Sequence, residues 1–376
     1  MEYEKHDKAL GYQKERFDKI FKKLEGLNLD GLLISNQSNI TYLLGCPIRD
    51  AYLLLANPDK FITPKNKKLG FFITDFRYFE EAKKNLKNFF IKKADGSLFN
   101  LISKLAAQLK LKKVGFEAKN LAFAEYEKIK EGVSPDINLI PTYDLIEPIR
   151  EIKSDYELDL IREAVRINIQ AFKFARNIIK PGLTEWDLAN KLEGFIKEKG
   201  ADSFSFDIIV ASGAHSSFPH HLTSREKIKA NQPLLIDMGV DFKGYKSDLT
   251  RVFFLGKITP VFKRTYEIIL RAQEKAIRHI KPRISISNID RIARQYIAQR
   301  GFGRFFGHNL GHGIGLEVHE EPHISAKNNR RLMEGMVFTI EPAIYLPEKF
   351  GIRIEDMVLV TKKGVEILSG NLDKSI

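Results

Sequence analysis

Apolar residues in the first 150 positions form short runs, separated by longer stretches with helical spacing. A helix is expected over residues 12–27, and strands are expected at 31–35, 52–55, 70–74, 89–92 and 113–116. Strands that alternate with helices are typical of an α/β domain. The segment 141–149 contains two prolines and is expected to be a linker. The pattern therefore predicts a first domain over residues 1–150.

The pattern changes beyond residue 150, where two helix starts are followed mainly by strands. Ser154-Asp155-Tyr156-Glu157 is a capping-box sequence, and Thr184-Glu185-Trp186-Asp187 is similar. The first should open a helix that ends near residue 179, and two more helices are expected at 262–280 and 287–300. Grouped strands with flanking helices are typical of an α+β domain, expected here over residues 151–376.

Composition narrows the class of protein. The single cysteine, Cys46, excludes a disulfide framework within the chain. The net charge of +13 is evenly spread: residues 1–150 have 26 basic and 20 acidic side chains (+6), and the remainder has 35 and 28 (+7). This spread does not predict a nucleic-acid partner. The N-terminal sequence MEYEKHDKAL has no signal-peptide core, and no apolar stretch approaches the roughly 18 residues of a membrane helix. A cytoplasmic protein is expected.

Two strand-like segments flank a tight turn at residues 241–244. If the turn is centred between Phe242 and Lys243, Asp237 and Asp248 lie directly opposite each other. Their Cβ atoms would then be roughly 4.5–5.5 Å apart, and like charges at that distance destabilise a sheet. A bound cation would remove the repulsion.

A second hairpin is expected from segments 337–345 and 352–360, with its centre at Glu348. This register places Glu341 opposite Glu355. Two carboxylate pairs suit hard cations such as Mn, Mg or Ca and, with a histidine, Co, Zn or Fe. The alternative is two accidental pairs of solvated carboxylates, which the apolar surroundings of both pairs disfavour.

Eight of the nine histidines lie between residues 215 and 323. His308 and His312 belong to the glycine-rich segment 307–316, so a helical metal-binding pair is not expected there. Glycines in such a segment indicate close approach of the backbone to another group. A lone buried histidine is usually a core residue, but two carboxylate hairpins in the same chain favour a ligand.

Three segments resemble a known family. His312-Gly-Ile-Gly-Leu-Glu-Val-His319-Glu, Thr339-Ile-Glu341-Pro-Ala-Ile-Tyr345 and Arg353-Ile-Glu355-Asp are similar to the proline-peptidase branch of the pita-bread metallopeptidases, as in aminopeptidase P and prolidase. The ligand order Asp, Asp, His, Glu, Glu matches, with gaps of 11, 64, 29 and 14 residues. The motifs cover the chain from about residue 150 onward. Residues 1–150 resemble the creatinase-like N-terminal domain only in size and coarse pattern.

The resemblance implies a pita-bread catalytic domain that binds two divalent metal ions per chain, with Mn favoured and Co, Zn or Fe open. Asp237 would bind one ion, His312 and Glu341 the other, and Asp248 and Glu355 would bridge them. A water molecule between the ions would attack the peptide bond.

The resemblance also implies roles around the ions. Glu341 would shuttle a proton, while His220 and His319 would contact the substrate and complete the catalytic set. Tyr345 would line the pocket, and Arg353 would orient a ligand carboxylate. The implied substrates are peptides with proline at the second position, and the implied assembly is a homodimer.

His323 departs from one branch of the family. Many archaeal-type prolidases have an arginine here, which suits the free carboxylate of a dipeptide. Histidine, with an ordinary pKa of about 6.5, suits it less at neutral pH. His323 is therefore expected to contact substrate in an Xaa-Pro aminopeptidase rather than a dipeptidase, unless Arg330 or Arg331 compensates.

Three other functions remain open at this point. Methionine aminopeptidase shares the fold and all five ligand types, but its usual form lacks an extra domain of this size. Creatinase-like hydrolases lack the complete metal set. A non-enzymatic binding module of the same fold typically loses ligands. A serine hydrolase is not expected, because the chain has no Gly-x-Ser-x-Gly turn.

Overall fold

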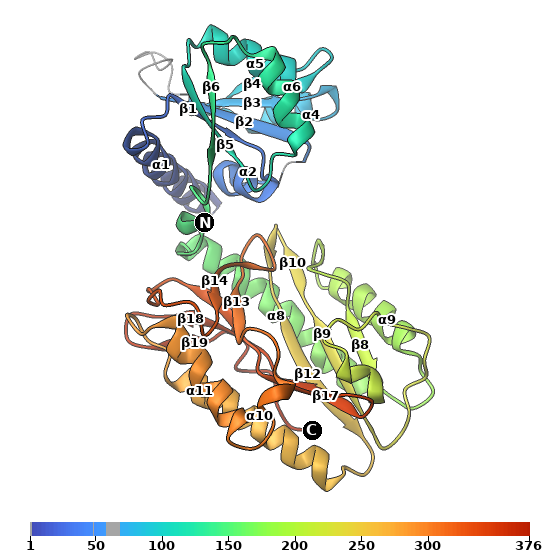
Figure 1. The fold of residues 1–376 in the computed structure, drawn as a ribbon. Coiled ribbons are helices and arrows are strands. Elements are labelled where there is room, and N and C mark those ends of the chain that lie inside the picture. The colour runs from blue at the N-terminus through green and yellow to red at the C-terminus, as the bar shows by residue number, and fades with distance from the viewer. Residues whose placement is uncertain (1, 48, 58–67) are drawn as a thin grey trace. The chain divides into compact units, whose positions relative to one another are not determined.

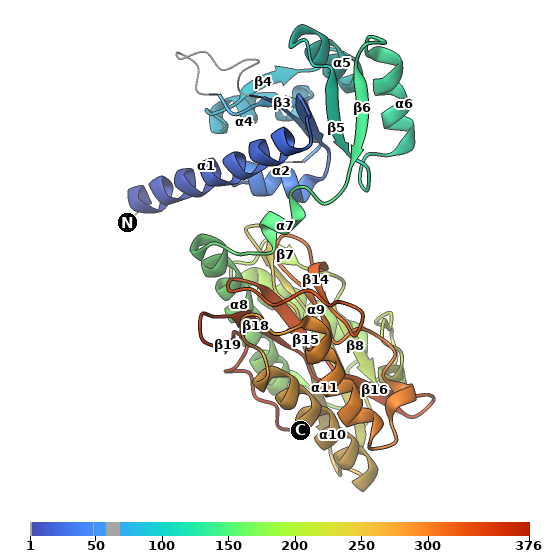
Figure 2. The ribbon, with the colours of Figure 1, turned by 60° about the vertical axis from the view of Figure 1, so that its left-hand side comes forward.

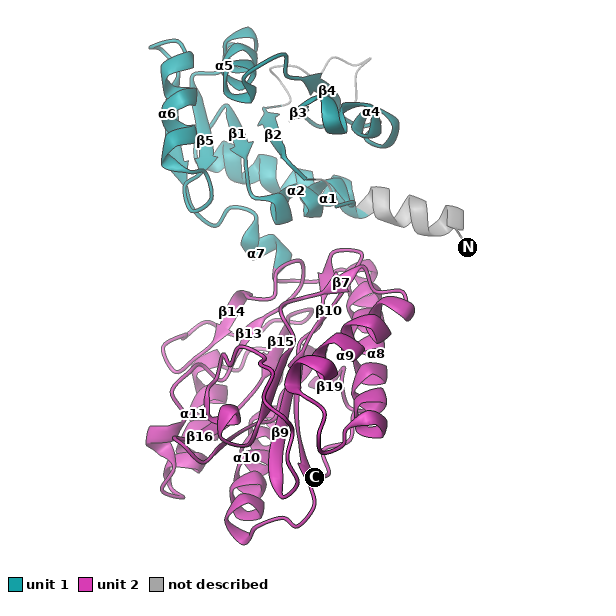
Figure 3. Ribbon diagram, turned by 90° about the vertical axis from the view of Figure 1, so that its right-hand side faces the viewer, with its two compact units in different colours: residues 1–150 teal, residues 151–376 magenta. Residues whose placement is uncertain are grey.

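The computed structural model describes the backbone of residues 2–47, 49–57 and 68–376, with side chains from residue 12 onward. Its internal contacts divide the chain into two compact units, Met1–Arg150 and Glu151–Ile376 (Figure 3). The first unit contains one sheet and the second contains several, and each unit has its own buried apolar side chains. In the part of the chain that is described, no helix is long and apolar enough to cross a membrane.

The first unit is built on one mixed sheet in the strand order β4-β3-β2-β1-β5-β6. β1 pairs antiparallel with β2 and parallel with β5. The strands are β1 Gly31–Ile34, β2 Ala51–Ala56, β3 Phe71–Thr74, β4 Phe90–Lys93, β5 Lys113–Glu117 and β6 Asn138–Thr142. All four residues of β1 are buried, because the strand lies in the middle of the sheet.

Helices alternate with these strands along the chain, so the α/β character predicted for the unit is confirmed. They are α1 Glu2–Gly26, α2 Gln37–Leu44, α4 Phe76–Asn85, α5 Leu98–Gln108, α6 Phe123–Gly132 and α7 Glu147–Arg150. The prediction of a linker at residues 141–149 is wrong, because β6 and α7 include most of that segment. Pro141 belongs to the edge strand β6, where no outer neighbour needs its missing N–H, and α7 follows.

The second unit has two pairs of helices with strands between them (Figures 1 and 2). The helices are α8 Asp155–Ile178, α9 Glu185–Glu198, α10 Pro260–Arg278 and α11 Ile286–Ala298, with short 3₁₀ helices η1 Gly213–Ser217 and η2 Gly303–Phe305. Both predicted helix starts are confirmed. The Ser154 amide donates to Glu157 at 2.9 Å, and the Asp187 amide donates to Thr184 Oγ1 at 3.0 Å.

The strands of this unit form antiparallel sheets, ordered β11-β10-β7, β12-β9-β8, β14-β13-β15-β18-β19 and β16-β17. Their bounds are β7 Ser203–Phe204, β8 Ile209–Ser212, β9 Gln232–Met238, β10 Val240–Phe242, β11 Tyr245–Lys246, β12 Leu249–Leu255, β13 Gly311–Gly313, β14 Glu320–Ile324, β15 Val337–Ile340, β16 Ala343–Leu346, β17 Phe350–Arg353, β18 Asp356–Val360 and β19 Val365–Ile367. The α+β prediction is confirmed.

The first predicted hairpin forms, but its register differs from the prediction. Asp237 lies opposite Thr250, and Asp248 precedes β12. The turn residues are Lys243 and Gly244, with φ of 52° and 85°. Two positive φ angles match the strand twist in a two-residue hairpin turn, and glycine accepts such an angle without strain. The turn centre therefore shifts by one residue, and the two aspartates are diagonal rather than opposed.

The second hairpin has the predicted register, but it is interrupted at the two glutamates. Ile340 pairs with Asp356, and Ala343 pairs with Arg353, so Glu341 and Glu355 occupy the gap between two ladders. Pro342 follows Glu341 and has no N–H to donate, which is consistent with a break here. Because the pairing is broken here, Glu341 and Glu355 lie at the ends of strands, and both line a cavity.

Candidate metal centre

All ten residues proposed from the sequence for metal or substrate line one cavity of about 660 Å³ in the second unit. The four carboxylates and His312 lie in, or next to the ends of, five different strands of this unit. The ten are Asp237, Asp248, His312, Glu341 and Glu355, together with His220, His319, His323, Tyr345 and Arg353. Residues up to 135 positions apart in sequence are thus brought to one site, within a single compact unit.

His312 is held at the centre of β13 by its two glycine neighbours. A Cβ atom on Gly311 would lie 1.9 Å from the Thr339 carbonyl oxygen, and one on Gly313 would lie 2.1 Å from that of Glu321. Only glycine permits such close backbone approach. The predicted close approach is confirmed, and the partner is the backbone of neighbouring segments.

The His312 ring is oriented for coordination. Its Nδ1 lies 3.1 Å from the Gly313 carbonyl oxygen and donates to it, which directs Nε2 toward Asp248 Oδ2 at 3.6 Å and Glu341 Oε1 at 3.5 Å. Burial, followed by the effect of His319, lowers the pKa of His312 to about 3. The neutral imidazole is the form that binds metals.

The carboxylates crowd together without enough positive charge from the protein. Burial and neighbouring carboxylates raise the pKa of Asp248 and Glu341 well above the ordinary range and that of Glu355 to about 8. Among the described residues, Asp237 Oδ1 and Asp248 Oδ1 are buried without a hydrogen-bond partner. Unpaired buried carboxylate oxygens are costly, and divalent cations would satisfy them.

Asp248, His312 and Glu355 offer one ligand atom each within 4.8 Å of one another. All three side chains are buried. The donor set of oxygens and one imidazole nitrogen is the type that Mn, Co, Zn and Fe accept. The residues present therefore fit the metal ions that the sequence implied.

A buried hydrogen-bond chain orients two of the carboxylates. Arg353 donates through Nη2 to Asp237 Oδ2 at 2.5 Å and through Nε to Thr250 Oγ1 at 3.0 Å. The Thr250 hydroxyl in turn donates to Glu355 Oε2 at 2.7 Å. Thr250 therefore links Arg353 to a second carboxylate. The correct hairpin register would have indicated this residue, because Thr250 is the one opposite Asp237.

His308 also lines the cavity, although its sequence position gives it no defined role. Its Nε2 lies 3.5 Å from the Tyr345 hydroxyl, and its Nδ1 lies 3.9 Å from Glu341. Burial, followed by the charge of Arg353, lowers the pKa of His308 to about 4. A sequence signal exists in its glycine-rich segment, four residues before His312, but that signal does not distinguish a substrate contact from a packed side chain.

The two arginines proposed as alternatives to His323 are engaged elsewhere. Arg330 forms a double ion pair with Glu151, at 2.7 and 2.5 Å, and Arg331 donates to the Arg283 carbonyl oxygen at 2.8 Å. Neither belongs to the described cavity lining, whereas His323 does. Within that lining the one arginine is Arg353.

Two family models match the chain. Residues 159–362 match metallopeptidase family M24, and residues 16–152 match the creatinase/prolidase N-terminal domain. The first match alone covers more than half of the chain and contains all five candidate metal ligands. The second covers most of the first structural unit.

Relatives of known structure or name span nearly the whole chain. A Xaa-Pro dipeptidase of Pyrococcus horikoshii is 35% identical over 94% of this chain and 97% of its own. The structure of a Xaa-Pro dipeptidase from Bacillus anthracis has a TM-score of 0.89 at 35% identity, covering 95% of this chain and 98% of its own. That of an X-Pro aminopeptidase from Thermotoga maritima has a TM-score of 0.83 at 34% identity, covering 94% and 99%. This chain therefore belongs to metallopeptidase family M24, in its proline-peptidase branch, and is a peptidase with a creatinase/prolidase N-terminal domain.

Proposed function

We propose that this peptidase hydrolyses the bond between an N-terminal residue and a proline at the second position of a peptide. The observation that carries the proposal is the assembly of an Asp, Asp, His, Glu, Glu donor set in the same cavity as His220 and His319. The names of the relatives support this substrate class, since each of the three acts on Xaa-Pro bonds by its name.

The proposed cofactor is a pair of divalent ions, with Mn²⁺ as the first candidate. Asp237 would hold one ion, His312 and Glu341 the other, and Asp248 and Glu355 would bridge them. The 3.5–3.6 Å approach of His312 Nε2 to Asp248 and Glu341 supports this division of ligands. When bound, such ions supply Lewis acidity and lower the pKa of water near neutrality.

The chain's own residues would handle the proton and the substrate oxygen. Glu341 Oε1 lies 3.5 Å from His312 Nε2, beside the proposed ions, where it could take up a proton from the attacking water and pass it to the leaving proline nitrogen. Partial desolvation, followed by the effects of His220 and His323, lowers the pKa of His319, so the ring is neutral at neutral pH and keeps one N–H. That N–H would donate to the carbonyl oxygen of the bond being cleaved.

The cavity lining favours peptides longer than a dipeptide. In an Xaa-Pro dipeptide the proline itself has the free carboxylate, and an uncommitted cation binds that group most strongly. Among the described lining residues the one arginine, Arg353, is already paired with Asp237, and there is no lysine. We therefore place an Xaa-Pro aminopeptidase first.

A specific observation favours a second candidate, an Xaa-Pro dipeptidase. Two of the relatives above have that name, and one of them matches this structure with a TM-score of 0.89. The test is hydrolysis of Xaa-Pro dipeptides beside Xaa-Pro-Yaa tripeptides by Mn²⁺-loaded protein. A higher kcat/KM for tripeptides supports the first candidate, and a clear dipeptide preference makes the chain a dipeptidase.

His323→Arg is expected to shift selectivity toward dipeptides. The His323 side chain is 52% exposed at the cavity, so an arginine there could reach a substrate carboxylate. A partly buried charge pair is worth about 1–2 kcal/mol, which corresponds to roughly 5–30-fold in the ratio of kcat/KM values. Steady-state rates on matched dipeptides and tripeptides measure the shift. His279→Arg, at an exposed histidine of another segment, is the control, and an unchanged ratio in both variants would contradict the role given to His323.

Thr250→Val is expected to weaken Mn²⁺ binding by about 10–100-fold, because groups that orient metal ligands typically contribute that much. The change keeps the side-chain volume but removes the hydroxyl between Arg353 and Glu355. Titration with Mn²⁺ measures the affinity, and Thr250→Ser should restore most of it. Thr265→Val, a buried threonine bonded only within α10, is the matched control. Equal affinity in the Thr250 and Thr265 variants would exclude the orienting role.

The homodimer and the cytoplasmic location are proposals of the same kind. The homodimer follows from the family resemblance, and the cytoplasmic location follows from the low cysteine content.

A further inference from the structure

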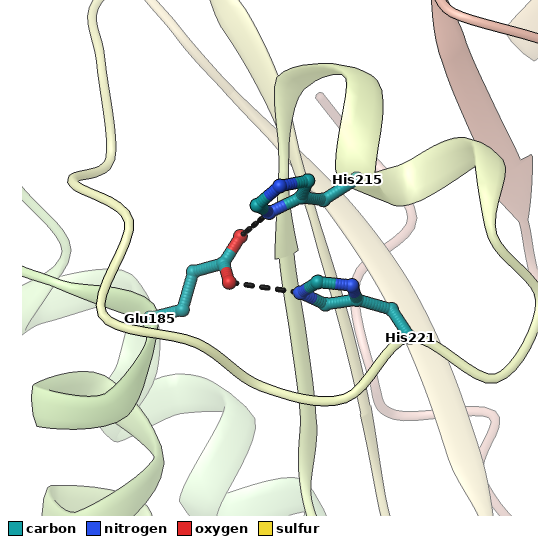
Figure 4. Close-up of side chains that lie close together, drawn as sticks. All are labelled: Glu185, His215 and His221. Atoms are coloured by element: carbon teal, nitrogen blue, oxygen red, sulfur yellow. Dashed lines mark hydrogen bonds and ion pairs between the residues drawn. The ribbon is translucent and has the colours of Figure 1, made fainter.

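A buried carboxylate outside the metal centre gathers two histidines. Glu185, the first residue of α9, is 0% exposed. Nδ1 of His215 lies 2.9 Å from its Oε1, and Nε2 of His221 lies 2.9 Å from its Oε2 (Figure 4). The two rings stack with centroids 4.4 Å apart. Glu185, His215 and His221 are also chemically able to hold a metal ion.

The hydrogen bonds of Glu185 favour a structural anchor over a metal site. Oε1 also accepts from the Ser212 amide at 2.7 Å, and Oε2 accepts from the Ser224 hydroxyl at 2.7 Å and the Ser224 amide at 3.1 Å. With the two rings, five donors surround a group that has about four lone-pair sites. The hydrogen-bonding capacity of the Glu185 carboxylate is therefore filled by protein groups. In the candidate metal centre, by contrast, Asp237 Oδ1 and Asp248 Oδ1 have no hydrogen-bond partner.

The protonation of this cluster follows from its bonds. Burial alone would raise the pKa of Glu185, but the bonds from Ser212, Ser224 and the two histidines outweigh it and lower the pKa. An ionised carboxylate only accepts, so both rings must donate. The proton of His221 is then on Nε2, and that of His215 is on Nδ1.

The anchored segment carries His220. The His220 side chain is exposed and lines the metal-centre cavity, so its own packing does little to fix it. Its neighbours are tied on both sides. The Pro219 carbonyl oxygen accepts from Arg353 at 3.4 Å, and the His221 ring donates to Glu185 at 2.9 Å. The shorter bond, to an ionised acceptor, is the stronger restraint.

We propose that Glu185 and His221 are positioning residues, which hold the backbone of residues 219–221 so that His220 faces the substrate. The proposal rests on the substrate role proposed for His220. It differs from a metal site in what it predicts for metal content. It differs from a general stabilising role because substitution of Glu185 or His221 should lower the rate only when His220 is present.

The test compares His221→Ala with His221→Gln, whose amide can replace the ring N–H at similar reach. A displacement of about 1 Å at a catalytic group can cost up to roughly 10²-fold, so kcat/KM of His221→Ala on an Xaa-Pro peptide should fall by about tenfold or more. Metal content should stay at the wild-type value, and His221→Gln should recover most of the rate. His279→Ala, an exposed histidine elsewhere, should match wild type.

The decisive comparison repeats His221→Ala in a His220→Ala background. Little further loss of rate is expected there, because the group being positioned is already absent. An undiminished further loss would overturn the proposal, and so would a metal ion in excess of two per chain that His221→Ala removes.

A crystal structure of His221→Ala provides a readout independent of turnover. A displaced backbone at His220 supports the proposal, and an unmoved backbone contradicts it. If the wild type does not cleave Xaa-Pro peptides, the proposed function fails, while the position of His220 in the two crystal structures still decides the role of the anchor.

Discussion

Asp248→Ala is expected to abolish peptide hydrolysis and to remove most of the bound metal. Asp248 is 5% exposed and lies within coordination reach of both His312 and Glu355. Asp248 is the carboxylate proposed to bridge the two ions, so its removal is expected to weaken the binding of both ions. The remaining carboxylates would still crowd each other, with less positive charge to balance them.

Metal analysis of purified protein and the hydrolysis rate together test this expectation. Asp159→Ala is the matched control, since its side chain is 74% exposed on α8. The control should keep wild-type metal content and activity. Near wild-type turnover with two metals bound in Asp248→Ala would remove Asp248 from the ligand set, and with it the division of ligands proposed above.

His319→Ala is expected to retain both metals and to lose about 10²–10³ in kcat, the typical effect of removing one donor to a developing negative oxygen. The His319 ring lies beside that of His312, with centroids 4.3 Å apart, and it is exposed at the cavity. It is thus close enough to the metal centre to reach a substrate bound there.

His319→Gln separates the donor role from bulk, because it keeps an N–H but not the ring. Partial recovery of kcat relative to His319→Ala is expected. Loss of metal from His319→Ala would instead mean that His319 coordinates an ion. A change in KM alone would mean that it binds ground state and transition state equally.

Much of the candidate metal centre could be predicted from the sequence, because four of its five proposed ligands belong to two hairpins whose pairing is set locally. The register that places Glu341 opposite Glu355 follows from the loop around Glu348, and the structure has that register on both sides of the gap. The glycines beside His312 likewise indicated close backbone contact, which the neighbouring strands provide.

The first hairpin shows why other features could not be predicted. Alternation along the strands does not fix the centre of a turn. Lys243 adopts a positive φ that residue type alone does not indicate. The predicted register is therefore wrong by one residue at the turn centre, and it does not place Thr250 opposite Asp237. Long-range contacts are harder still. Glu185 meets His215 and His221 across 30 and 36 positions of sequence, with no local pattern to connect them.

The most direct test of the central claim compares release of the N-terminal residue from Ala-Pro-Gly and Ala-Ala-Gly by Mn²⁺-loaded protein. The proposed function predicts cleavage of the proline peptide and little or none of the alanine peptide. Equal and substantial cleavage of both peptides would contradict an Xaa-Pro peptidase, and so would selective release of methionine from a Met-Ala-Gly peptide included in the same assay.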